Sequence, residues 1–313
     1  MKNSVIIVII LVLLNSCGSE GNGELVGVED RSEWFEAIPH GMLFIPMGSF
    51  NMGPSDQDVA SAITSQTKTV SIDPFWMDET EITNNEYRQF VYWVRDSLAR
   101  RLLAETLEEF LLPDPEDGEA PDPPLLNWEE EIRWQDSPEQ IQILEDGNLF
   151  LRKEERFWNR KEIDAHQLNY QYWWIDLKQA AKKSNRYDFK TKKYTGQVID
   201  NEGNKVDIED RSSFIMTGNV NIYPDTLVWM ADYTYSYNEP WTKMYFWHPA
   251  FDEYPVVGVT WVQANAFCIW RTQFMNDWLL SNSENLVQDY RLPTEAEYWI
   301  LGINSPLLQY RIF

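Results

Sequence analysis

The 313-residue sequence has few of the side chains that carry most enzyme chemistry. It contains two cysteines, Cys17 and Cys268, and three histidines, His40, His166 and His248. The histidines are scattered without metal-ligand spacing, so we do not expect a zinc or iron site built on them. The sequence also shows no glycine-rich phosphate loop. We therefore predict no catalytic, cofactor-binding or metal-binding residues.

Basic residues are scarce as well. The chain has 26 Lys and Arg against 50 Asp and Glu, which gives a formal net charge of −24. Nucleic acids and anionic membrane surfaces attract proteins through basic patches, so this balance argues against both as partners. A basic protein partner fits better and would associate in a salt-sensitive way. With 43% hydrophobic residues and 15 Trp, the chain can bury a large core.

Long hydrophobic runs are missing except at the N-terminus. Lys2 precedes an apolar run over residues 5–14, and the run ends in Leu-Asn-Ser-Cys17. This order is typical of a lipoprotein signal peptide, and the run is about half the roughly 20 residues that a membrane span needs. We predict a cleaved signal peptide at 1–16, lipidation of Cys17, and a lipid anchor and tether over 17–40. Cys268 then has no disulfide partner and is expected to be a buried structural thiol.

Short strands and capped helices dominate the local patterns. Residues 42–53 and 69–78 are apolar runs punctuated by Gly and Pro, which predicts strands and turns. Three capping boxes, in which a Thr is followed three positions later by Glu or Gln, predict helix starts. The boxes pair Thr83 with Glu86, Thr260 with Gln263, and Thr294 with Glu297.

The first two predicted helices each have one apolar face. In the first, the helical pattern starts at Tyr87 and continues through Leu107 until Pro113 stops it. In the second, bulky side chains along one side predict packing in the core rather than a cofactor site. These side chains are Phe267, Trp270, Phe274 and Trp278.

The composition and the local patterns of the chain change between the two predicted helices. Residues 113–124 are acidic and proline-rich, which predicts a surface linker. Residues 162–183 show helical periodicity, and a turn at 201–204 predicts a hairpin between 195–199 and 205–208. The β-branched residues of 254–260 predict a short buried strand.

Four motifs resemble one family in content and order. They are GSFNMG at 48–53, DETEITN at 78–84, PVVGVTW at 255–261 with AFCIW at 266–270, and RLPTEAE at 291–297. The chain thus resembles the formylglycine-generating-enzyme (sulfatase-modifying factor) family. That resemblance implies an α+β, C-type-lectin-like fold, with its first part at 41–97 and its second at 248–299. Residues 98–247 would then be a partly helical insertion. The tail at 300–313 departs from the family, so we expect a domain that is incomplete at its C-terminus.

The resemblance also bears on chemistry. Enzymes of the formylglycine-generating kind use a pair of active-site thiols with copper, and this chain has only Cys268 once Cys17 is lipidated. Further motifs at 23–28, 87–97, 222–226 and 245–249 resemble the GldK/PorK ring lipoproteins of type IX secretion and gliding motility. This implies a non-catalytic structural subunit, lipid-anchored on the periplasmic face of the outer membrane. It would self-associate into a ring with a GldN/PorN-like partner and contact other secretion-system subunits.

Two alternatives stay open at this point: a formylglycine-generating-type enzyme and a glycan-binding, lectin-like lipoprotein. The aromatic clusters at 170–174 and 233–247 could bind sugar, although aromatics among polar residues are more typical of protein interfaces. The acidic pairs could be acid/base or calcium residues, but helix capping and buried hydrogen bonding explain them with fewer assumptions. These pairs are Glu79 with Glu81, and Glu295 with Glu297.

Overall fold

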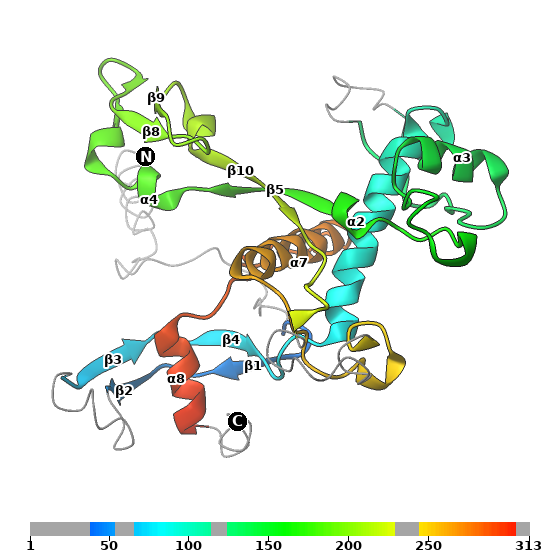
Figure 1. The fold of residues 1–313 in the computed structure, drawn as a ribbon. Coiled ribbons are helices and arrows are strands. Elements are labelled where there is room, and N and C mark those ends of the chain that lie inside the picture. The colour runs from blue at the N-terminus through cyan, green and yellow to red at the C-terminus, as the bar shows by residue number, and fades with distance from the viewer. Residues whose placement is uncertain (1–37, 54–65, 114–123, 229–243, 305–313) are drawn as a thin grey trace, which may run out of the picture. The chain divides into compact units, whose positions relative to one another are not determined.

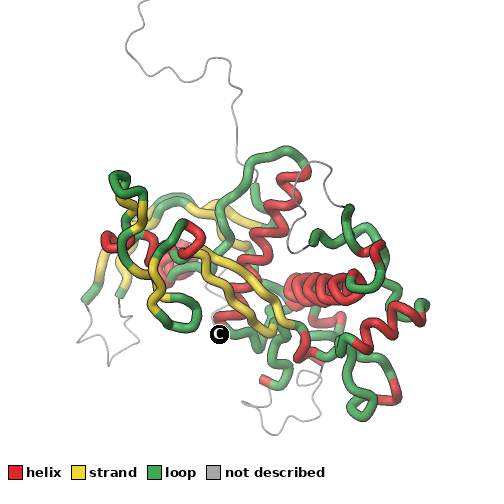
Figure 2. Tube along the Cα trace, turned by 90° about the horizontal axis from the view of Figure 1, so that it is seen from above, coloured by secondary structure: helices red, strands yellow, loops and turns green. Residues whose placement is uncertain are grey.

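The computed structural model describes residues 38–53, 66–113, 124–228 and 244–304. The predicted signal peptide, Cys17, most of the tether, residues 233–243 of the second aromatic cluster and the tail beyond residue 304 lie outside these ranges. The described residues combine helices with two-stranded antiparallel sheets, which confirms the α+β class (Figures 1 and 2). The predicted domain limits and C-terminal incompleteness stay predictions.

The first strands form two antiparallel pairs. β1 (Met42–Ile45) pairs with β4 (Phe75–Asp78), and β2 (Gly48–Met52) pairs with β3 (Lys68–Ile72). The strands predicted at 42–53 and 69–78 are therefore confirmed. α8 (Glu295–Asn304) packs on the second pair.

The helix α2 (Asn84–Ala104) begins at its predicted cap. The Glu86 amide donates to the Thr83 hydroxyl at 3.2 Å, and the Thr83 amide donates to the Glu86 carboxylate at 2.8 Å. The predicted extension through Leu107 is wrong. The amides of Thr106 and Leu107 both donate to the Leu103 carbonyl, so the chain turns there into a short 3-10 segment, η1 (Glu108–Phe110).

The second long helix, α7 (Trp261–Ser281), also begins at its predicted capping box. Its predicted core face is only half buried. Phe267 and Trp270 are buried, whereas Phe274 is 57% exposed and Trp278 is 53% exposed, so the prediction is wrong for these two. Phe274 stacks on Trp270 at 5.6 Å, but the buried core that surrounds Trp270 does not extend along the helix to Phe274.

The helix predicted at 162–183 is wrong. This stretch contains the strand β5 (Asn169–Ile175), which pairs along its whole length with β10 (Ile215–Asn221). Tyr170 and Tyr172 are buried while Gln171 and Trp173 are exposed, a period of two that belongs to a strand with one face on the core. β5 and β10, here called the ribbon, both contact α7 (Figure 1).

A small lobe follows the far end of the ribbon. This distal lobe, residues 176–214, holds one short helix and two short hairpins, and the hairpin predicted at 195–208 is confirmed. Its elements are α4 (Leu177–Ala180), η4 (Lys183–Asn185), β6 (Tyr187–Asp188), β7 (Lys193–Tyr194), β8 (Gln197–Ile199), β9 (Lys205–Asp207) and η5 (Arg211–Phe214).

The strand predicted at 254–260 is wrong. Only one isolated bridge forms there, between Thr83 and Pro255. Beyond this bridge the Val256 amide donates to the Ile82 carbonyl at 2.9 Å, and the Gly258 carbonyl accepts from the Asp225 amide at 2.8 Å. Proline has no amide to donate to a ladder, and Gly258 adopts a left-handed φ of 81°, so these bonds do not continue into a strand. The other elements in the described ranges are α3 (Pro138–Asp146), η2 (Phe157–Asn159), η3 (Ala165–Gln167) and η6 (Pro249–Phe251).

Three hydrophobic clusters hold these elements. The first joins α2, the ribbon and α7 around Phe90, which is fully buried. The second joins the end of α2 to η1 and α3 around Phe110, and the third is the small core of the distal lobe around Phe214. In the described ranges no helix is both long and apolar enough to cross a bilayer.

Candidate interaction surface

Buried polar side chains of α2 hold a neighbouring loop. The Arg88 guanidinium donates to the Phe246 carbonyl at 3.0 Å and forms an ion pair with Asp252. Asn84 donates its side-chain amide to the Phe251 carbonyl at 2.9 Å. These buried side chains thus donate hydrogen bonds to backbone carbonyls, which is how buried structural polar residues are usually satisfied.

Cys268 lies on α7 beside an ion pair. Arg271 donates two 2.8 Å hydrogen bonds to the Asp78 carboxylate and stacks over the ring of Tyr290. Burial raises the pKa of the Cys268 thiol to about 11, while the nearby Arg271 lowers it in part. A thiol with this pKa is almost fully protonated at neutral pH and is a weak nucleophile.

The histidines stay apart and exposed. The ring of His166 bonds the Asp164 carboxylate at 2.9 Å, and His40 and His248 lie in surface segments. Within the described residues no three His, Cys, Asp or Glu side chains gather as a possible metal-binding group.

One of the four acidic side chains singled out in the sequence has the predicted capping role. Glu297 accepts from the Thr294 amide at 2.7 Å and from Arg291 at 2.6 and 2.8 Å, and these bonds hold its pKa at about 2. The prediction is wrong for the other three, which are exposed and make no side-chain hydrogen bond to a described residue. These are Glu79, Glu81 and Glu295.

The ribbon presents an apolar face to solvent. Ile175 and Ile215 are cross-strand partners with 59% and 48% of their surface exposed, and Trp173 beside them is 49% exposed. Within the described residues the ribbon has two strands, so each strand has one edge without a ladder partner. An exposed apolar face with free strand edges is typical of a surface that binds protein.

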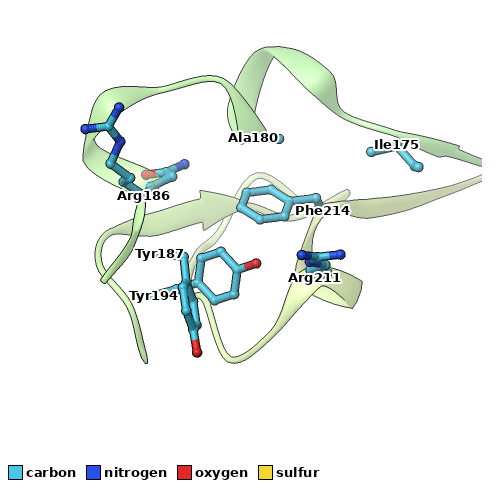
Figure 3. Close-up of a pocket in the computed structure, with 8 residues that line it drawn as sticks. Ile175, Ala180, Arg186, Tyr187, Tyr194, Arg211 and Phe214 are labelled. Carbon is cyan, nitrogen blue, oxygen red and sulfur yellow. The ribbon is translucent and has the colours of Figure 1, made fainter. Parts of the chain in front are cut away.

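A hollow of about 400 Å³ lies where the ribbon enters the distal lobe (Figure 3). The rings of Tyr187 and Tyr194 meet edge to face at 5.0 Å, and Tyr194 meets Phe214 in the same way at 6.0 Å. Two exposed arginines, Arg186 and Arg211, complete the rim, and neither forms an ion pair with a described residue. The remaining lining residues are Ile175, Ala180 and Asn185.

The first half of the distal lobe is basic, in contrast to the whole chain. Residues 177–198 contain one acidic side chain, Asp188, and seven basic ones. The net charge of −24 conceals this stretch, and a charge count in a sliding window would have found it. The basic residues are Lys178, Lys182, Lys183, Arg186, Lys190, Lys192 and Lys193.

Residues 32–300 match the family model described as the sulfatase-modifying factor enzyme 1-like domain. The chain belongs to this family. Neither a curated protein nor a solved structure matches the chain. The sulfatase-modifying factor family includes both enzymes and non-catalytic members. Membership therefore does not decide whether this chain is catalytic, and its function has to be inferred from its own residues.

In this member of the sulfatase-modifying factor family, the motif residues build the framework. Thr83, Thr260 and Thr294 each cap a helix. Asp78, from the second motif, accepts both hydrogen bonds of Arg271 and so ties β4 to α7. The exposed apolar face and the hollow lie instead in residues 173–215, between the motifs.

Proposed function

We propose that this chain is a non-catalytic structural subunit of the type IX secretion and gliding motility machinery, similar to the GldK/PorK ring lipoproteins. In this proposal it is lipid-anchored through Cys17 to the periplasmic face of the outer membrane and forms a ring with a GldN/PorN-like partner. The observation that carries the proposal is the exposed apolar face of the ribbon, continued by the aromatic hollow and its arginine rim. Surfaces rich in Trp, Tyr and Arg are typical of protein–protein interfaces.

The placement of the reactive groups also supports a structural role. Cys268 is a partly buried thiol whose pKa is raised by burial, whereas a cysteine nucleophile needs a lowered pKa. Among the charged groups of the family motifs, Asp78 is paired with Arg271, and Arg291 is paired with Glu297 in the cap of α8. In this proposal the family motifs stabilise the fold, and the residues between the motifs supply the contact surface.

The proposal is tested by purifying the tagged, full-length protein from its host in mild detergent. Mass spectrometry identifies the co-purifying proteins, and negative-stain electron microscopy shows the particles. We expect ring-shaped particles that contain a second secretion subunit. A lone small particle that converts the cysteine of a sulfatase-derived peptide to formylglycine would overturn the proposal in favour of the enzyme. A lone particle that binds glycans would favour the lectin-like alternative.

A further inference from the structure

We infer that copies of this chain associate head to tail, with the basic hollow of one copy receiving an acidic surface at the end of α2 in the next. This inference rests on the proposed function, because it names the contact by which a scaffold subunit would bind its own kind. The two surfaces belong to different hydrophobic clusters of the same chain, the third and the second. Both surfaces are built from residues that the structure describes.

The receiving surface is basic and apolar. Lys182, Lys183, Lys190 and Lys193 are exposed around the lobe, and none forms an ion pair with a described residue. The rings of Tyr187, Tyr194 and Phe214 line the hollow, and Figure 3 shows Arg211 beside them and the Arg186 guanidinium directed away from them. Such a surface fits a partner that presents an apolar tip surrounded by carboxylates.

The acidic surface has such an apolar tip surrounded by carboxylates. It consists of residues 105–113 and 124–131, which include six glutamates and no Lys or Arg. Leu112 and Leu125 lie on neighbouring backbone segments, joined by a 2.9 Å bond from the Leu112 amide, and they are 45% and 54% exposed. None of the glutamates forms an ion pair with a described residue. They are Glu105, Glu108, Glu109, Glu129, Glu130 and Glu131.

The two surfaces complement each other in charge and in apolar content. The leucine pair supplies a branched apolar tip for the ring-lined hollow, and the glutamates would meet the arginine rim. Because one surface contacts a different surface on the next copy, the contact is heterologous, and repeating it builds a ring or an open filament according to the rotation between neighbours. This geometry is what a ring subunit needs.

Charge reversal on each surface tests the inference. The first variant carries Arg186→Glu with Arg211→Glu, and the second carries Glu108→Lys with Glu109→Lys. Sedimentation velocity of the full-length chain in detergent, over a range of protein and salt concentrations, measures the association. We expect the unaltered chain to form oligomers that salt dissociates. Each variant alone should associate at least about tenfold more weakly.

An equimolar mixture of the two variants is the decisive sample. The unaltered acidic surface of the first variant can then pair with the unaltered hollow of the second. The two reversed surfaces are also of opposite charge to each other, so alternating copies should restore the oligomers. A variant with Arg152→Glu and Lys153→Glu, whose exposed basic residues lie outside both surfaces, makes the same charge change and should leave association unaltered. Because an unfolded variant could not restore oligomers, recovery in the mixture also shows that both variants are folded.

Three outcomes overturn the head-to-tail contact: a monomeric unaltered chain, variants that associate normally, or a mixture that fails to recover. Particles purified from the host distinguish failure of the head-to-tail contact from failure of the proposed function. Rings with a second subunit that persist in cells expressing either variant would leave the structural role standing and exclude this contact.

Discussion

Among single residues, Glu297 shows how a family motif stabilises the fold. Its carboxylate receives the Thr294 amide and two hydrogen bonds from Arg291, and it is buried at the start of α8. The Arg291 bonds are the main cause that lowers its pKa, and the Thr294 bonds add to them. The charged form is therefore the one that holds the helix start in place.

Because the folded-state pKa of Glu297 is about 2 and its ordinary value is 4.5, this carboxylate stabilises the fold fully above pH 4.5. Its contribution is lost as the pH falls from 4.5 towards 2. We expect Glu297→Gln to lower the melting temperature at pH 7 and to reduce its pH dependence in that window. Thermal melts monitored by circular dichroism measure both effects. Glu295→Gln, an exposed neighbour in the same helical turn, should change neither, and equal effects of the two variants would contradict this role.

At the residue scale the sequence predicted the three helix caps well and the thiol in part. A capping box is local, because its two partners are three positions apart, so all three helix starts could be read directly. The protonated state of Cys268 depends on burial among side chains of α7 and on Asp78, which is 190 positions away in the chain. The sequence predicted a buried thiol, but Cys268 is only partly buried, and the ion pair beside it could not be predicted.

Among the elements, errors arose where neighbours distant in the sequence decide the outcome. β5 became a strand because β10, about 45 residues later, pairs with it residue for residue. The aromatic and charged residues of 162–183 fit a helical repeat as well as an alternating one when the partner strand is unknown. Similarly, the predicted core face of α7 is buried only at Phe267 and Trp270, which belong to the first cluster, and is exposed at Phe274 and Trp278.

The segment around Gly258 gives an element-scale prediction. Gly258 has a φ of 81°, and a Cβ there would lie 2.2 Å from the Asp225 carbonyl oxygen. We expect Gly258→Ala to destabilise the fold by roughly 3 kcal/mol, because left-handed strain and steric overlap add. Gly203→Ala is the matched control, since Gly203 has a similar φ of 87° with nothing within 4 Å. It should cost about 1 kcal/mol, and equal losses in urea unfolding would show that the Asp225 contact does not matter.

At the scale of the whole molecule, charge is divided unevenly. The acidic surface has six glutamates without a basic residue, whereas residues 177–198 carry seven basic side chains and one acidic one. Composition alone predicted only an acidic protein with a basic partner. The structure shows that the same chain supplies both kinds of surface, each on its own hydrophobic cluster.

The predicted anchor is also a property of the whole molecule. Cys17 lies outside the described residues, so its lipidation rests on the N-terminal pattern. We expect Cys17→Ser to abolish incorporation of labelled palmitate and to move the protein from the membrane fraction to the soluble fraction. Cys268→Ser should alter neither result. Persistent labelling of the Cys17→Ser variant would contradict the predicted site.

The register of the ribbon bears on how the distal lobe could arise in evolution. Ile175 and Ile215 face each other across the two strands, so the chain leaves for the distal lobe and returns from it at nearly the same point. A tight turn of two residues could close the strands there. The whole lobe, with its basic hollow, could thus be gained or lost in a single genetic insertion or deletion without disturbing the first cluster. Relatives with a plain hairpin at this position would share the framework and lack the receiving surface.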